Sequence, residues 1–280
     1  MSIYLAYDGS VNANWIARYA IRMAAHHPEK RLYIVYIGDA GTRAPNLSQG
    51  INQIETEAEQ AGVEAVLQIR PMRHGVFGGL QEHIPQGPET FVICGARVKR
   101  GHEGYLRGTI SEQLLKLRQF NVMALRVVQP GLLGVARNVL APVSRNPLGF
   151  KSGMKFLELL APDIQRLHLI QIIERSRRPI RLQPAARIKE RRNRAQVYIR
   201  GIEADIVEKI PMQGIHVDSH VDIAESWSNK INIHATRLHT NLIYLEIPRQ
   251  SLTKRFLFSD PLEDLLSSTF CDIAVYRGIE

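Results

Sequence analysis

The sequence has few of the residues that mark a secreted, redox-active or membrane-spanning protein. It holds only 2 cysteines in 280 residues, Cys94 and Cys271, far from the C-x-x-C spacing of a metal or redox motif. Its first residues read as a buried strand, without the basic stretch and apolar run of a secretory signal. No apolar run is long enough to cross a bilayer. We therefore expect a cytoplasmic protein with reduced core thiols that is not embedded in a membrane.

Catalytic motifs are also lacking. The 10 histidines show no triad spacing, and neither Ser10 nor Ser111 follows the pattern of a nucleophile elbow. The chain is therefore predicted not to be an enzyme.

One cluster of metal-ligand residue types does occur, as His216, Asp218, His220 and Asp222 alternate along a predicted strand and so share one face. A zinc or other divalent ion is one interpretation. Side chains on one face of a strand are about 6–7 Å apart, however, which is too far to converge easily on one ion. We favour the wetter face of an edge strand and predict no metal site.

The length of 280 residues suits two domains, and the two halves follow one plan. Residues 3–7 and 32–37 read as strands, and the residues between them carry the apolar stripe of an amphipathic helix. An offset of 135 residues aligns residues 31–35 with 166–170, and an offset of 151 aligns 91–94 with 242–245. We expect tandem doubly wound, Rossmann-like α/β domains, each a five-stranded, mainly parallel sheet with helices on both faces.

The domain boundary is predicted at the proline and glycines of residues 130–134, which gives domains of 1–130 and 136–280. The two offsets differ because the second half carries an insertion around 174–200, which holds ten Lys and Arg residues and much of the net charge of +9. The insertion fits a solvated, partly helical excursion. The alternative is a landing surface for an anionic partner such as nucleic acid or lipid, although Tyr198 is its only aromatic residue.

A candidate binding motif follows the predicted strand at residues 91–95. Thr109 and Glu112 have the spacing of a capping box, so Thr109 is predicted to begin a helix. Gly108 would let the backbone approach a ligand, and the helix start favours an anion. Arg97, Lys99, Arg100 and Arg107 add positive charge. A glycine-rich turn leading into a capped helix, without a ligand, is the alternative.

Three features of the first half resemble the universal stress protein family, namely residues 6–10, Gly95 and residues 108–112. The resemblance covers residues 1–129 and extends more faintly to residues 137–280. ATP-binding members of that family carry G-x-x-G, nine further residues and G-[ST]. Gly95, Gly108 and Thr109 match three of these positions, and Val98 stands at the second glycine. The resemblance implies weak binding of ATP or AMP, with Mg²⁺ accompanying ATP. The implied contacts are Ala6, Tyr7, Asp8 and Ile37 to the nucleoside, and Gly95, Arg97, Gly108, Thr109 and Ile110 to the phosphates.

The second half has lost the motif. Asp8 aligns with Val143, Gly95 with Glu246 and Thr109 with Asp260. The two carboxylates are expected to repel an anionic ligand there.

Two functions follow from these observations. The first is a stress-type regulatory protein that senses an adenine nucleotide in its first domain. The second is a nucleotide-free adaptor or scaffold that acts through domain pairing and the basic insertion on an unidentified protein or anionic partner. Each half ends in an apolar strand, at 122–125 and 273–276, and the resembled family pairs through this strand. An internal pseudo-dimer is therefore expected, and a homodimer is the alternative.

Overall fold

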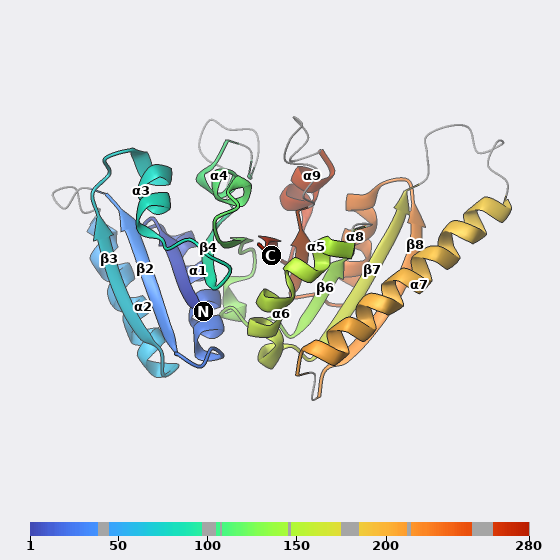
Figure 1. The fold of residues 1–280 in the computed structure, drawn as a ribbon, viewed down its shortest axis with the longest axis horizontal. Coiled ribbons are helices and arrows are strands. Elements are labelled where there is room, and N and C mark those ends of the chain that lie inside the picture. Colours follow the sequence, from blue (N-terminus) through green and yellow to red (C-terminus); the bar gives the residue numbers. More distant parts are fainter. Residues whose placement is uncertain are drawn as a thin grey trace. The chain divides into compact units, whose positions relative to one another are not determined.

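The computed structural model describes residues 1–38, 45–96, 105–106, 108–144, 147–174, 185–211, 214–247 and 260–279. It divides into two compact units, one comprising Met1–Val135 with Ala274–Glu280 and the other comprising Ala136–Ile273. Figure 1 shows the course of the chain through both.

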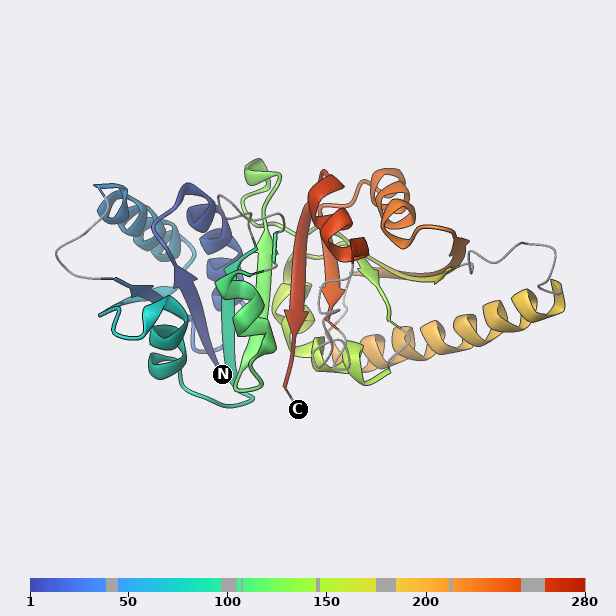
Figure 2. The same cartoon turned by 90° about the horizontal axis from the view of Figure 1, so that it is seen from above.

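The first unit is a parallel sheet with helices on both faces. Its strand order is β3-β2-β1-β4-β5, and these strands pair in parallel. Helices α1 and α2 lie on one face and α3 and α4 on the other (Figure 2). The elements are β1 (Ser2–Tyr7), α1 (Val11–Ala25), β2 (Arg31–Ile37), α2 (Pro45–Gln60), β3 (Glu64–Arg70), α3 (Gly75–His83), β4 (Thr90–Gly95), α4 (Ile110–Lys116), β5 (Asn121–Arg126) and the 3₁₀ turn η1 (Pro130–Leu132).

The second unit repeats this arrangement with parallel strands in the order β9-β6-β7-β8. Its helices also lie on both faces, with α7 opposite α8 (Figure 2). The elements are β6 (Asn138–Pro142), α5 (Pro147–Ser152), α6 (Met154–Leu160), η2 (Ala161–Asp163), β7 (Arg166–Glu174), α7 (Ala185–Lys209), β8 (His216–Ala224), α8 (Trp227–Arg237), β9 (Leu242–Glu246) and α9 (Asp260–Ser268). The expected doubly wound α/β fold with mainly parallel strands is confirmed.

The apolar pattern of the sequence accounts for the packing of α1. Ser10 caps this helix, because its Oγ accepts the N–H of Ala13 at 3.1 Å. Ile16, Tyr19 and Met23 are each 2% exposed or less, as the helical spacing of these residues predicts. The same face carries Asn12 and Ile16 toward the carboxyl ends of the strands, where the candidate site lies.

The last strand differs from the sequence prediction. β10 (Asp272–Arg277) was expected to complete the second domain, but residues 274–280 are grouped with the first unit. The buried Arg277 side chain donates from Nη1 to the Leu115 carbonyl at 3.0 Å, and the Ile279 N–H donates to Asn121 Oδ1 at 2.9 Å. Contacts between residues more than 150 positions apart leave no local signal in the sequence.

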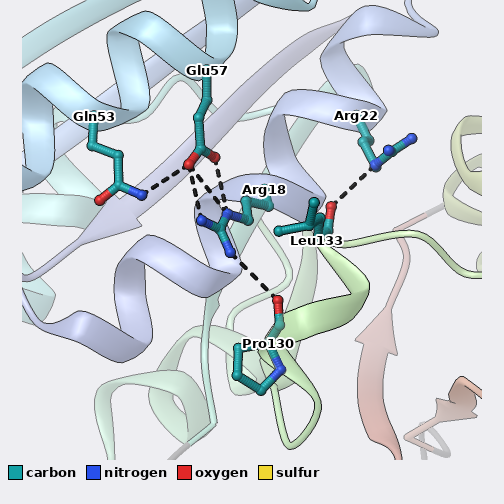
Figure 3. A network of polar contacts seen from close by, with 6 residues as sticks. All are labelled: Arg18, Arg22, Gln53, Glu57, Pro130 and Leu133. Carbon is teal, nitrogen blue, oxygen red and sulfur yellow. Dashed lines mark hydrogen bonds and ion pairs between the residues drawn. The ribbon is translucent and has the colours of Figure 1, made fainter.

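The predicted boundary segment packs against α1 within the first unit (Figure 3). Arg18 forms an ion pair with Glu57 at 3.0 Å and also donates to the Pro130 carbonyl at 3.4 Å. Arg22 donates from Nε to the Leu133 carbonyl at 3.1 Å. The carbonyl groups of this Gly- and Pro-rich segment therefore accept hydrogen bonds from the arginines of α1, which explains why the segment has a defined course.

The basic insertion is helical as far as the structure describes it. Residues 175–184 lie outside the described range, and residues 185–200 form the first part of α7. This helix has 25 residues where α2 has 16. Its basic side chains Arg187, Lys189 and Arg192 are exposed, whereas Ile199, Ile202 and Ile206 are buried. The exposed basic end and the buried apolar end thus belong to one continuous helix.

Candidate functional site

A cavity of about 120 Å³ lies at the carboxyl ends of the strands of the first unit. β1 pairs with β2 on one side and with β4 on the other. The strands that follow β1 therefore build the sheet first toward one edge and then toward the other, and the order of the strands reverses at β1. Ligands of open α/β sheets bind at such a point. Six of the nine residues predicted from the sequence line this cavity, namely Ala6, Tyr7, Asp8, Ile37, Gly95 and Ile110.

Asp8 is held at the mouth of the cavity by a tight turn. Gly9 follows it with φ of +75°, a left-handed conformation that side chains disfavour. The Ser10 N–H then donates to Asp8 Oδ1 at 3.0 Å. The carboxylate is exposed, and the turn fixes its direction relative to β1 and α1. It is therefore placed to accept hydrogen bonds from a ligand that enters the cavity.

Tyr7 contributes to the cavity wall, but its hydroxyl group is directed elsewhere. The phenol donates to Asn14 Oδ1 at 2.5 Å, and the side chain is buried. Burial, with a smaller contribution from the charge of Asp8, raises the pKa of Tyr7 to about 12. A Cβ at Gly50 would lie 2.2 Å from this hydroxyl, so Gly50 makes room for it. The hydroxyl of Tyr7 therefore fixes α1 and is not offered to a ligand.

Gly95 ends β4 beside the side chain of Ile16 of α1. A Cβ at this position would lie 2.9 Å from Ile16 Cδ1, which explains the glycine without reference to a ligand. The Ser111 hydroxyl donates to the Gly95 carbonyl and so ties α4 to the end of β4. The adjacent Cys94 thiol is buried, and burial raises its pKa to about 12, which keeps it protonated and unreactive.

The predicted capping box at Thr109 is present, with one difference. Thr109 Oγ1 accepts the N–H of Glu112 at 3.2 Å, as expected of an N-cap. Glu112 Oε2 returns to the N–H of Gly108, at 2.5 Å, rather than to that of Thr109. The N–H of Thr109 bonds to the Leu106 carbonyl at 3.1 Å. A carboxylate of the chain itself thus accepts from the N–H of Gly108, which the resemblance assigns to the phosphates.

Three of the nine predicted residues are not found on the wall of this cavity, and one of these three lies outside the described residues. Gly108 and Thr109 are described and are not among its lining residues. Arg97 and Val98 lie outside the described residues. Sequence reasoning missed Asn12, Val76 and Ser111. Asn12 and Ser111 each lie two residues after a capping residue, which was a local signal, whereas no sequence motif links Val76 of α3 to the ends of β1 and β4.

The second unit has a different arrangement at the matching strand ends. Val143, which aligns with Asp8, is only 6% exposed. Glu246 ends β9 where Gly95 ends β4, and it accepts a hydrogen bond from Ser144 Oγ at 3.1 Å. Ser259 lies outside the described residues. The carboxylate of Glu246 thus lies at the strand end where the first unit has Gly95, which has no side chain.

The histidines and aspartates of β8 divide into two groups, one around each aspartate. The carboxylate of Asp218 lies within 4.0 Å of both histidines of the strand. Asp218 accepts from His168 of β7 at 2.8 Å. Asp222 pairs with Lys230 at 2.9 Å and with His234 at 3.0 Å, both on α8. Burial alone would raise the pKa of Asp222, but the hydrogen bonds from Lys230 and His234 outweigh it and lower the pKa to about 2. Within the described ranges, no three His, Cys, Asp or Glu side chains are grouped so that they could hold a metal ion.

Comparison with solved structures identifies the fold. A universal stress protein from Archaeoglobus fulgidus DSM 4304 superposes with a TM-score of 0.58 at 13% identity, covering 99% of this chain and 97% of its own. A putative universal stress protein from Pseudomonas aeruginosa UCBPP-PA14 gives 0.57 at 14% identity, covering 98% and 92%. The fold is therefore that of the universal stress proteins, along the whole chain.

The same fold is shared with a protein of another kind. The cytoplasmic domain of a prokaryotic cation chloride cotransporter superposes with a TM-score of 0.61 at 9% identity, covering 99% of this chain and 94% of that domain. No family model and no curated protein sequence matches the chain. Among the described residues, none of the helices has the length and apolar character to cross a membrane.

Proposed function

We propose that the chain is a universal-stress-type regulatory protein that binds an adenine nucleotide, ATP or AMP, in its first unit. The observation that carries the proposal is the cavity at the point where the strand connections reverse, with six of the nine expected residues on its wall. The fold shared with universal stress proteins supports it. In this proposal the nucleotide acts as a signal, and its occupancy changes how the protein meets a partner.

The residues suit a nucleoside better than a phosphate chain. Asp8 would accept hydrogen bonds from ribose hydroxyls or an adenine amino group, and Ile37 would offer backbone groups to the base. The cavity of about 120 Å³ is small beside ligand pockets of roughly 300–1,000 Å³. Only part of the nucleotide would therefore be enclosed, and the phosphates would lie toward Gly108 and Thr109. Phosphate binding there requires displacement of the Glu112 carboxylate, so we expect weak affinity.

Titration of the purified full chain with ATP, with and without Mg²⁺, and with AMP tests the proposal. We expect binding of both nucleotides at one site, in the micromolar to millimolar range. Bound nucleotide that copurifies with the protein would give the same answer. Absence of binding of either nucleotide at millimolar concentration, even to Val98→Gly, would overturn the proposal.

A nucleotide-free adaptor is the second candidate. The likeness to the cytoplasmic domain of a transporter favours it, since there the fold accompanies a membrane protein. In this function, the exposed basic side chains at the start of α7 would form the binding surface for an anionic partner. Polyanion binding that falls steeply with added salt, and that disappears when residues 176–193 are deleted, would support this function. The deletion is expected to leave the melting temperature nearly unchanged.

A further inference from the structure

A pocket of about 320 Å³ lies in the second unit between the end of β7 and α7. Its lining residues are Gln171, Ile173, Arg191, Arg194, Ala195 and Tyr198. Four of them come from the basic segment, and none belongs to the motif that suggested a nucleotide in the first unit. The pocket also lies at the carboxyl end of its strand, where parallel α/β sheets bind ligands.

The pairing of β7 with β8 directs Gln171 into the pocket. Leu169 of β7 lies in register with Ser219 of β8, whose Oγ donates to Glu203 of α7 at 2.6 Å. This face of the two strands is therefore the one covered by α7. Since alternate residues of a strand share a face, Gln171 points to α7 as well.

Two polar atoms of the pocket are buried without a partner. The Gln171 side chain is only 4% exposed, and its Oε1 has no hydrogen-bond partner. Tyr198 Oη is buried in the same way and also has no partner. Buried polar atoms of proteins are nearly always hydrogen-bonded, because an unmet bond costs free energy. The two atoms therefore indicate a ligand that supplies both an acceptor and a donor.

The charges of the pocket select an anion. Arg191 is half-buried, and Arg194 is exposed and paired with Glu190 on the preceding turn, a pair that solvent screens. Burial, and to a smaller extent the charge of Glu246, raises the pKa of Tyr198 to about 12, so its hydroxyl remains a donor at neutral pH. Glu246 itself is not among the lining residues and is bonded to Ser144.

We propose that this pocket binds a small phosphomonoester that carries a free hydroxyl group. The phosphate oxygens accept from the guanidinium groups of Arg191 and Arg194 and from the hydroxyl of Tyr198. The ligand's hydroxyl donates to Oε1 of Gln171. The volume, near the lower limit of about 300 Å³ for ligand pockets, suits a phosphate with a few carbon atoms. A solvated basic helix explains Arg187 and Arg192 but not the two buried unpaired atoms.

Calorimetric titration of the full chain with glycerol 3-phosphate, sulfate and glycerol tests the proposal. In a low-salt buffer free of phosphate, glycerol 3-phosphate is expected to bind most tightly. Sulfate is expected to bind more weakly, because it has no hydroxyl for Gln171, and glycerol is expected not to bind. If glycerol 3-phosphate fails to bind at millimolar concentration, or binds no better than sulfate, the proposal is wrong.

Matched variants separate a built pocket from diffuse positive charge. Arg191→Ala should weaken glycerol 3-phosphate at least about tenfold, whereas Arg192→Ala, with the same charge change at an exposed position of the same helix, should have little effect. Gln171→Leu should weaken glycerol 3-phosphate about fivefold and leave sulfate unchanged. Equal losses in the two arginine variants would overturn the proposal. Melting temperatures verify folding. A loss of glycerol 3-phosphate binding in Arg191→Ala, on α7 of the second unit, separates this pocket from the nucleotide site of the first unit.

Discussion

The two units present the same parallel βα arrangement with different groups at the strand ends. In the first, β1 is followed by Asp8 and a glycine turn, and β4 ends in Gly95 beside a cavity. In the second, the matching positions hold the buried Val143 and the carboxylate of Glu246. Apolar strand residues maintain the sheet in both, while a few residues at the strand ends decide the chemistry. The fold is thus preserved independently of the site.

The largest effect is expected from exchanging the residues that end β4 and β9. Gly95→Ala places a Cβ 2.9 Å from Ile16 Cδ1, and the overpacking should lower the free energy of unfolding by about 1–3 kcal/mol. Glu246→Ala removes a partly exposed carboxylate and its hydrogen bond from Ser144, so it should cost about 1 kcal/mol or less. Urea unfolding of both variants measures the difference. Equal costs would show that close approach of α1 does not explain the glycine.

The second comparison concerns the residues that follow β1 and β6. Asp8→Ala should weaken ATP and AMP alike, by about tenfold or about 1.4 kcal/mol, because it removes an acceptor for the nucleoside. Val143→Ala, the matched control, should leave nucleotide affinity unchanged. Calorimetry with both nucleotides decides this. A loss confined to ATP would place Asp8 near the phosphates and contradict the assignment.

Val98→Gly should restore the family's second glycine and tighten ATP by about 1 kcal/mol or more. The resemblance implies that Val98 stands at the point of closest phosphate approach, where its β-branched side chain would hinder the triphosphate more than the single phosphate of AMP. The ratio of ATP to AMP affinity is therefore the measurement. An unchanged ratio would mean that the loop at Val98 does not meet the phosphates.

The smallest effect concerns the second unit alone. Because the pKa of Asp222 is lowered to about 2 in the folded state, its pairing stabilises the protein above the pKa of the unfolded chain, near 4. This stability is lost as pH falls from about 4 to 2. Since the side chain is about one-third exposed, we expect about 1 kcal/mol. Asp222→Asn should remove this part of the acid dependence, and Asp8→Asn should not.

Local patterns in the sequence were enough to predict the fold and part of the site. The alternating apolar strands and amphipathic helices predicted the parallel α/β sheets, and the spacing of Thr109 and Glu112 predicted the cap of α4. These features depend on residues within one element or one turn. The resemblance to universal stress proteins implied that Ala6, Asp8 and Gly95 share one site. All three line one cavity, because parallel strands end at one edge of a sheet.

Only the tertiary structure decided where side chains from different elements meet. In the structure, the hydroxyl of Tyr7 donates to Asn14, and the N–H of Gly108 donates to Glu112. Residues 274–280 are grouped with the first unit, although the sequence places them in the second domain. The tertiary structure also placed Gln171 of β7 and Tyr198 of α7 in one pocket. Such contacts depend on how each helix packs on its sheet, at distances of a few ångströms that residue order does not specify. The sequence therefore determined the framework, and helix packing determined which polar groups were left to meet a ligand.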